Sequence, residues 1–397
     1  MRRNTLLIAL ASALLLPLTA APASAAGRSL GAVGVSVAGG SLGAVGVSVA
    51  GGSLGAVGVS VAGGSLGAVA VSDAGRSLGA VPASAAGHLL GAVPATAAGH
   101  PRPGPLPVAG DVVVHDPTMI RTASGYVVYS THGRLEARTS PDMVHFTRAG
   151  DAFATPPAWW SDYSPDNDPW APDISFHRGR YLLYYAVSTF GSNHSAIGLA
   201  TSATGLPGSW SDRGIVYATD REDDHNAIDP NLSVDRAGRW WLSFGSYWTG
   251  IRMIRIDPAD GMRLASDSTV HHLATRPDAP YAVEAPAVIK RGRYYYLFAS
   301  YDRCCAGTES TYNIRVGRAT SPTGPYVDRD GVPMLDGGGT LVLRTEGSRI
   351  GPGGQSVIRD RNRDLLVYHY YDGEDGGTPK LALRYLTWDP RGWPSVT

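Results

Sequence analysis

The stretch VEAPAVIKRGRYYYLFAS, residues 283–300, decides the fold. It has a polar start with a proline, an apolar strand, a turn that contains glycine and a second strand rich in aromatic residues. Glu284 does not fit this pattern, because an unpaired charge buried at the start of an apolar strand costs on the order of several kcal/mol. The stretch therefore predicts either that this end of the strand is open to solvent or that the carboxylate has a function.

The same unit recurs along the chain. Close copies are HDPTMIRTASGYVVYST (115–131), WAPDISFHRGRYLLYYAVS (170–188) and IDPNLSVDRAGRWWLSFGS (228–246), and a divergent copy is GGQSVIRDRNRDLLVYHYYD (353–372). The five starts lie near residues 116, 171, 229, 284 and 354, at intervals of 55, 58, 55 and 70 residues. Such a period, with about four strands in each unit, is typical of a β-propeller.

We therefore predict an all-β fold, a five-bladed β-propeller that forms one domain over residues 108–397. A β-sandwich is the alternative for a chain of short strands separated by Gly, Asp and Pro, and the long regular period argues against it. In a propeller the first strand of each blade lines the central axis. The starts of these strands then converge at one mouth of the channel, where water reaches Glu284.

A different kind of sequence precedes this domain. Residues 1–26 have a basic start, an apolar run and small residues at Ala23 and Ala25, which together predict a secretory signal peptide. Residues 27–107 combine six copies of a twelve-residue unit rich in Gly, Ala, Val and Ser with the proline-rich linker PRPGPLP. This region has little to pack and much backbone entropy to lose, so we predict a disordered spacer. A wall anchor or a β-stacking segment is the alternative.

Composition narrows the class of partner. The chain of 397 residues carries 34 basic and 34 acidic side chains without a basic block, which argues against a nucleic-acid partner. With the predicted signal peptide and no stretch long enough to span a membrane, the sequence predicts an extracellular, soluble protein. We also expect a monomer. Its two cysteines, Cys304 and Cys305, are adjacent. Adjacent Cα atoms are about 3.8 Å apart, below the usual disulfide range, so we predict an oxidised but reducible bond.

Three carboxylates are predicted to meet at one mouth of the channel. Asp116 and Asp229 take the same place in their copies as Glu284 does in its own. Asp-Pro is a common turn pair, so each acid alone is weak evidence. Glycoside hydrolysis needs one protonated acid and one base or nucleophile on opposite faces of the sugar, and a third negative group raises the pKa of the acid. The three together predict a glycosidase.

Other residues near the mouth are candidates for supporting roles. Asp173, in WAPDI, lies two residues deeper in its strand and is predicted to line the channel, in a structural role or in support of substrate binding. Aromatic side chains near the blade starts are candidates to stack on sugar rings: Trp159, Trp160, Trp170, Tyr247 and Trp248. The sequence shows no His/Cys cluster with zinc spacing and no phosphate-binding loop.

The motifs HDP, AIDPNL and EAP, in this order and spacing, resemble glycoside hydrolase family 43. WAPDI, FGSYW, GPGGQSV and YHYYD narrow the resemblance to arabinan endo-1,5-α-L-arabinosidases, over about residues 108–395. The resemblance implies hydrolysis of arabinan, a side chain of plant pectin, with inversion of configuration. It implies that Asp116 is the general base, Glu284 the general acid and Asp229 the residue that tunes the acid. It also implies that Trp170 and Ser246 hold arabinose.

One departure concerns a metal. Many relatives carry a histidine in the GPG segment that helps to hold a central metal, often calcium, whereas this chain has Gly354 and Gln355 there. The resemblance implies no cofactor for the chemistry itself and at most a structural Ca²⁺ in the channel, and water or Gln355 would otherwise fill the space.

Three other functions remain open from the sequence. An exo-acting arabinofuranosidase or β-xylosidase of the same family would differ in the loops that close one end of the groove. A non-catalytic carbohydrate-binding propeller would tolerate the loss of one acid, and all three are present. A related class that attacks sucrose or fructans with retention has an Asn before the Asp and a Cys in its acidic motif, unlike HDP and EAP.

Overall fold

The computed structural model describes residues 104–396 without a gap, together with six short strands between Val33 and Pro82. Contacts divide the chain into two units, Met1–Ala98 and Gly99–Thr397. The strands of the first unit are β1 (Val33–Ala38), β2 (Val45–Val49), β3 (Val57–Ala62), β4 (Ala68–Asp73), β5 (Arg76–Ser77) and β6 (Val81–Pro82). The predicted signal peptide lies outside the described residues, and the disordered spacer stays a prediction.

The second unit consists of five sheets that follow one another along the chain, each with four antiparallel strands, as predicted. Blade 1 comprises β8 (Thr118–Thr122), β9 (Gly125–Ser130), β10 (Glu136–Ser140) and β11 (His145–Asp151). Blade 2 comprises β12 (Pro169–His177), β13 (Arg180–Val187), β14 (Ser195–Ser202) and β15 (Ser211–Thr219). Blade 3 comprises β16 (Asn231–Val234), β17 (Trp240–Phe244), β18 (Ile251–Ile256) and β19 (His271–Ala274).

Blade 4 comprises β20 (Val283–Arg291), β21 (Tyr294–Tyr301), β22 (Asn313–Ala319) and β23 (Thr340–Leu343). Blade 5 comprises β24 (Arg349–Asp360), β25 (Arg363–Asp372), β26 (Thr378–Trp388) and β27 (Pro394–Val396). The connections contain the short helices α1 (Trp160–Tyr163), η1 (Gly307–Glu309) and η2 (Met334–Asp336). Among the described residues, no helix is long and apolar enough to cross a bilayer.

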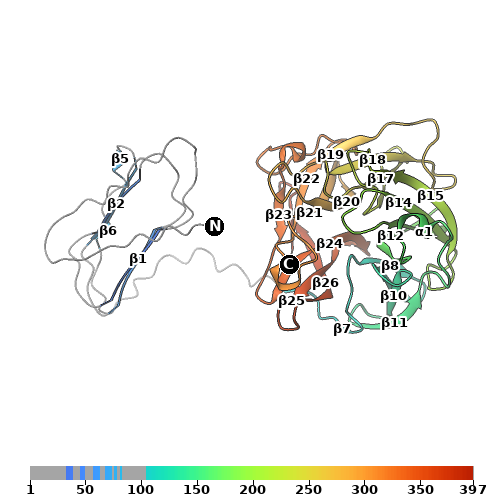
Figure 1. Cartoon of the computed structure of the whole chain (residues 1–397), viewed down its shortest axis with the longest axis horizontal. Coiled ribbons are helices and arrows are strands. Elements are labelled where there is room, and N and C mark those ends of the chain that lie inside the picture. Colours follow the sequence, from blue (N-terminus) through green and yellow to red (C-terminus); the bar gives the residue numbers. More distant parts are fainter. Residues whose placement is uncertain are drawn as a thin grey trace. The chain divides into compact units, whose positions relative to one another are not determined.

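The first strands of the blades form the inner wall of the propeller. β8, β12, β16, β20 and β24 contact one another in that order, and β24 contacts β8. The labels of β8, β12, β20 and β24 lie towards the middle of the ring in Figure 1. One hydrophobic core fills each of the five interfaces between neighbouring blades. The aromatic residues of the second strands supply much of it, for example Tyr129, Tyr185 and Phe298, all fully buried.

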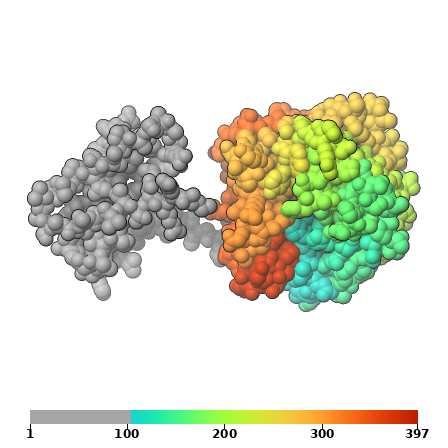
Figure 2. Space-filling model, in the orientation of Figure 1, coloured from blue at the N-terminus to red at the C-terminus, as the bar shows by residue number. Residues whose placement is uncertain are grey.

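The start of the propeller closes the ring. The Leu106 amide donates to the Leu383 carbonyl and the Leu381 amide to the Val112 carbonyl, both at 2.8 Å, so this segment lies along β26 of the last blade. The same segment contains β7 (Ala109–Gly110), which pairs in parallel with β11 of the first blade. Figure 2 shows the red C-terminal blade beside the cyan start of the ring.

A β-bulge recurs near the start of every inner strand. The register shifts by one residue between Trp170 and Asp173, between Glu284 and Ala287, and between Gly353 and Ser356. Blades 1 and 3 have the same extra residue. In blade 1 it lies between the Thr131–His115 backbone hydrogen bond and the Thr118–Tyr129 pair. In blade 3 it lies between the Gly245–Ile228 hydrogen bond and the Asn231–Ser243 pair. The middle residues of the five bulges have left-handed backbones: Asp116 (φ 47°), Ala171 (44°), Asp229 (58°), Ala285 (50°) and Gly354 (55°). Bulges of this kind redirect side chains and bend the strand.

The bulge corrects one prediction. Asp116 and Asp229 occupy the left-handed position, but in blade 4 that position belongs to Ala285, and Glu284 precedes it. The three acids therefore do not hold equivalent places. The sequence comparison aligned the acidic residues of the copies with one another. The residue that holds the same position in blades 1 to 4 is instead the proline that follows the left-handed bulge residue. Glu284 reaches the site from one residue earlier with a side chain that is one methylene longer.

Candidate active site

The five bulges surround a small central cavity of about 30 Å³. Asp116, Asp173 and Asp229 line this cavity, together with Ala285 and Gln355. The charges of Asp116 and Glu284 both act on Asp229, so the carboxylates of three blades lie within electrostatic reach of one another. The prediction that these carboxylates, far apart in the sequence, lie close together in the propeller is therefore confirmed.

Asp116 is held as an ionised carboxylate. Its Oδ2 accepts hydrogen bonds from Thr131 Oγ1 and His115 Nδ1, both at 2.8 Å. Burial by itself would raise its pKa, but the charge and hydrogen bond of His115, with Thr131, hold the pKa well below the usual range. The charge of His369 also lowers the pKa of Asp116, but His115 has the larger effect, and burial lowers the pKa of His369 itself well below its usual value. Asp116 therefore suits a base and not an acid.

The pKa values of Asp229 and Glu284 are raised, in contrast to the lowered pKa of Asp116. Burial raises the pKa of Glu284, and the charge of Asp116 raises it too, while hydrogen bonds from Ser246 and Tyr312 oppose this change. Burial also raises the pKa of Asp229 well above its usual value, with further repulsion from Glu284. The Ala285 amide, 2.9 Å from Asp229 Oδ2, acts in the other direction. Two such neighbours titrate as a pair, and this pair retains a proton more readily than an isolated carboxylate would.

Glu284 is less exposed than the sequence suggested. Only 6% of the residue is accessible, and Ser246 Oγ donates a hydrogen bond to its Oε2 at 2.5 Å. Ser246 was predicted to hold arabinose, and in this structure it contacts the carboxylate. Trp170 is half-buried, and its Nε1 donates to Asp168 Oδ2 at 3.3 Å. The prediction that Trp170 and Ser246 contact the sugar stays a prediction.

Asp173 joins two blades inside the channel. Asn231 Nδ2 and the Leu232 amide donate to its two carboxylate oxygens at 3.0 and 2.8 Å. Burial raises its pKa to about 6 despite these hydrogen bonds. These contacts assign Asp173 to the connection of β12 with β16, and the structure places it in the channel as the sequence suggested.

The family model described as "Glycosyl hydrolases family 43" matches residues 107–394. The chain belongs to glycosyl hydrolase family 43. Among its relatives, the extracellular endo-α-(1→5)-L-arabinanase 1 of Bacillus subtilis is 42% identical over 294 residues, which cover 72% of this chain and 88% of that protein. The extracellular exo-α-(1→5)-L-arabinofuranosidase ArbA of Cellvibrio japonicus is 38% identical over 303 residues, which cover 72% and 87%.

A solved family-43 structure has the same fold. The endo-arabinanase from Bacillus licheniformis aligns with a TM-score of 0.69 and 42% identity, over 73% of this chain and 99% of that chain. The similarity spans the propeller. The predicted family and the five-bladed fold are both confirmed.

Several residues of this family-43 site were not predicted from the sequence. Tyr312 hydrogen-bonds to Glu284, and His369 Nδ1 accepts the Asp116 amide at 3.1 Å. Tyr371 Oη is 2.9 Å from His115 Nε2 and accepts the Cys305 amide at 2.7 Å. The motif YHYYD contributed to the resemblance and contains two of these residues, but nothing local to it shows which atoms they contact.

The adjacent cysteines belong to the same network. A disulfide joins Cys304 to Cys305, with Cα atoms 3.8 Å apart, so the predicted oxidation is confirmed. Cys305 has a left-handed backbone (φ 60°), and its amide contacts Tyr371. The disulfide loop thus reaches His115 through Tyr371, and Cys305 Sγ also contacts His115 Nε2 directly at 3.9 Å.

The residues around Asp116 do not fit calcium. His115, Asp116 and His369 gather within 4.8 Å, but calcium takes about six to eight oxygen ligands and this group offers two imidazole rings. Because His369 Nδ1 accepts a backbone N–H, its proton lies on Nε2, and both nitrogens of His115 already have partners. Gln355 lines the channel instead, donating to the Ala285 carbonyl at 2.6 Å and accepting from Ser300 Oγ at 2.7 Å.

Some of the aromatic candidates for sugar stacking are buried in the core and others are exposed. Trp160 is fully buried in the core between blades 1 and 2, so the prediction that it stacks on a sugar is wrong. Trp159 packs partly against the same core. Trp248 is 40% exposed in the β17–β18 connection. Two aromatic residues that the sequence did not single out are more exposed in connections on the same side, Phe190 (82%) and Tyr281 (58%).

Proposed function

We propose that this protein is a secreted, inverting glycoside hydrolase that cleaves internal bonds of α-1,5-linked L-arabinan. The observation that carries the proposal is the pairing of an ionised Asp116 with a proton-retaining Asp229–Glu284 pair at one end of the channel. Inverting hydrolysis needs a base and an acid with these opposite tendencies. Relatives named as arabinanases supply the substrate class.

The proposed reaction begins with a water molecule on the Asp116 side of the sugar. Asp116 accepts a proton from this water as it attacks the anomeric carbon, and Glu284 protonates the departing oxygen. Repulsion between Asp229 and Glu284 keeps one proton on the pair, which Glu284 delivers, and Asp229 contributes to the orientation of the sugar. We expect the carboxyl groups of Asp116 and Glu284 to be roughly 6.5–9.5 Å apart, the separation that leaves room for water.

An exo-acting enzyme is the second candidate, favoured by the 38% identity to an exo-α-(1→5)-L-arabinofuranosidase. Secretion is supported by the predicted signal peptide and by relatives named as extracellular. A monomer is sufficient for the proposed chemistry, because one chain supplies all three carboxylates.

One digestion of linear arabinan tests both parts of the proposal. Endo action gives a ladder of oligosaccharides from the first minutes, whereas exo action gives one small product from the start. Proton NMR of the same early digest reads the anomeric configuration of the new reducing end, and we expect inversion. A Glu284→Gln variant is the control for contaminating activity. A digest without products, or with retained configuration, would contradict the proposed reaction.

A further inference from the structure

A repeated basic motif marks the turns between the first and second strands. These turns lie at the far ends of the inner strands, because each inner strand runs away from the carboxylates. They read RGR (178–180), RAGR (236–239), RGR (291–293) and RNR (361–363) in blades 2 to 5. The turn itself requires only the left-handed residue, for example Gly179 (φ 79°) or Gly292 (φ 56°). Nothing in the backbone geometry requires an arginine on each side of it.

We call this group the basic hub. It contains Arg121, Arg178, Arg180, Arg236, Arg239, Lys290, Arg291, Arg293, Arg359, Arg361 and Arg363. All except Arg180 are exposed. The acids of the same turns are Asp235, Asp360 and Asp364, and all three are buried. A chain with no net charge therefore concentrates positive charge around the end of the channel opposite the candidate active site.

The basic hub contains a groove between blades 4 and 5. Its volume is about 460 Å³, within the range of small-ligand sites, whereas the cavity at the carboxylates is far smaller. Ile289, Val357 and Ile358 supply an apolar floor, and Lys290, Arg291 and Arg359 supply the charge.

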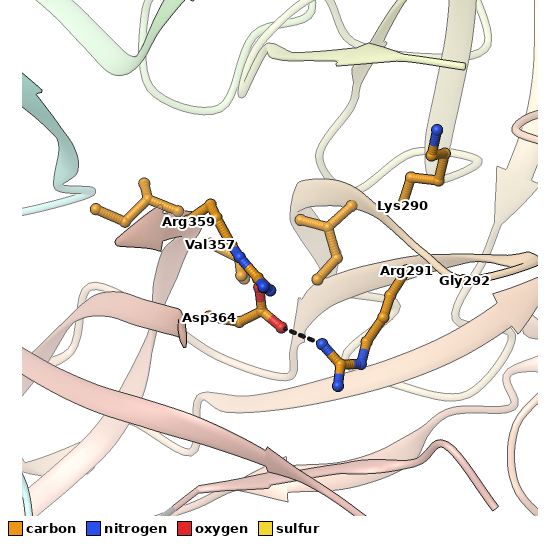
Figure 3. Close-up of a pocket in the computed structure, with 8 residues that line it drawn as sticks. Lys290, Arg291, Gly292, Val357, Arg359 and Asp364 are labelled. Carbon is orange, nitrogen blue, oxygen red and sulfur yellow. Dashed lines mark hydrogen bonds and ion pairs between the residues drawn. The ribbon is translucent and has the colours of Figure 1, made fainter. Parts of the chain in front are cut away.

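The guanidinium groups in the groove are held in place. Arg359 Nη1 and Arg291 Nη1 bond to the two oxygens of Asp364 at 2.6 and 3.2 Å, and Trp388 Nε1 donates to Asp364 at 2.9 Å. Figure 3 shows the two arginines converging on Asp364, with Lys290 extending away from them. One carboxylate pairs with two guanidinium groups here, and Lys290 also lines the groove, so the groove has an excess positive charge. Each of the two arginines retains N–H groups without a partner among the described residues.

We propose that this groove binds a short carboxylate-bearing sugar, a uronate oligosaccharide. Fixed guanidinium groups match the planar carboxylate, and the apolar floor matches the C–H face of a sugar ring. The outer loops of the same face carry Asp257, Asp260, Asp328 and Asp330, which oppose a broad anionic surface such as a duplex or a bilayer. The choice of a sugar over other small anions rests on the proposed polysaccharide hydrolase function.

Such a site would attach the enzyme to an acidic polysaccharide by the face opposite its catalytic mouth. The neutral arabinan would then remain free to enter the carboxylate site. The two sites are separated by the length of an inner strand, seven residues from Glu284 to Arg291, or about 23 Å.

Titration calorimetry of the full-length protein with trigalacturonate tests this proposal. We expect saturable binding that weakens at least about tenfold between low salt and about 0.3 M NaCl. Lys290→Gln with Arg359→Gln should weaken binding about tenfold, while Arg291 and Trp388 remain to pair Asp364. The matched control is Arg391→Gln, an exposed cation on an outer loop of the same face, which should bind as the wild type does. Melting temperatures of both variants verify folding.

Three results would overturn the proposal: no saturable binding of trigalacturonate, equal binding by the test and control variants, or complete displacement of the sugar by an equal concentration of sodium sulfate. Neutral maltotriose should not bind the groove. The measurement does not depend on arabinan hydrolysis, so failure of the proposed function and failure of this site are distinguishable.

Discussion

Asp116 accepts two hydrogen bonds at 2.8 Å, whereas Glu284 is 6% exposed and has a raised pKa. Carboxylates with these different surroundings take different roles in one reaction. His115 is central to the difference, because it joins Asp116 to Tyr371 and stacks on His369 with ring centroids 3.8 Å apart.

His115→Phe should therefore shift the acidic limb of the pH–rate profile. Phenylalanine keeps a ring against His369 but removes the hydrogen bond and charge that lower the pKa of Asp116. The base works when deprotonated, so a higher pKa moves the loss of activity on acidification to higher pH. Tyr371→Phe removes the hydroxyl that contacts His115 Nε2 and the Cys305 amide but leaves the His115–Asp116 hydrogen bond, so it should shift the limb less. An unchanged limb in His115→Phe would show that His115 does not act on the base.

Asp229→Asn should shift the opposite limb. Asp229 and Glu284 repel each other when both are ionised, so the pair keeps one proton to higher pH. The amide removes this repulsion, and the proton on Glu284 is then lost at lower pH. The acid works when protonated, and the loss of activity on alkalinisation then begins at lower pH. The pH dependence of kcat/KM on linear arabinan measures this change. A basic limb that stays in place or moves to higher pH would remove Asp229 from the role of tuning the acid.

The β-bulge of the inner strands places these carboxylates, and Gly354 shows how closely it is packed. A Cβ on Gly354 would lie 2.2 Å from Asp116 Oδ1 and 2.7 Å from the His369 ring, at a backbone φ of 55°. Because Gly354 has no side chain, blade 5 leaves room for the Asp116 carboxylate of blade 1.

Gly354→Ala should lower both stability and activity. A residue with a Cβ pays about 1–2 kcal/mol in the left-handed region, and the contact with Asp116 adds to this cost. The matched control is Ala285→Gly, at the same bulge position in blade 4, which relieves that backbone and should cost less stability. Urea denaturation and kcat on arabinan measure both effects. Equal behaviour of the two variants would mean that the bulge tolerates a side chain at Gly354.

The sequence predicted the elements better than their register. The strand–turn–strand unit occurs five times at a regular spacing, and each copy supports the interpretation of the others. The propeller and its inner strands could therefore be predicted from the sequence. The bulge adds one residue to each inner strand, and a comparison by acids placed Glu284 one position off. The contact of Asp116 with His369 could not be predicted for another reason. His369 is 253 residues away in the sequence, and only the closed ring brings it close to Asp116.

At the scale of the whole molecule, the propeller carries every residue of the proposed reaction. The family match begins at residue 107, after the repeat. The hydrophobic cores and the closing segment also lie within the described residues 104–396.

Deletion of residues 29–106 should leave hydrolysis of soluble arabinan nearly unchanged. The deletion retains Asp111–Val114 and β7 but removes Leu106, so the melting temperature is expected to fall slightly. A deletion of residues 29–100, which spares the linker and Leu106, is the control for that effect. A loss of kcat/KM greater than about tenfold in both forms, roughly 1.4 kcal/mol of transition-state stabilisation, would assign a function to the repeat.

The assignment of acid and base is tested most directly by the rates of Glu284→Ala on two substrates. Linear arabinan has a poor leaving group that needs protonation, and an aryl arabino-oligosaccharide with an activated phenolate does not. The account predicts a loss of at least about 10²–10⁴-fold on arabinan and a far smaller loss on the aryl substrate. Asp116→Ala, which removes activation of water, should slow both alike. Equal losses on the two substrates in Glu284→Ala would contradict the account and remove Glu284 from the role of general acid.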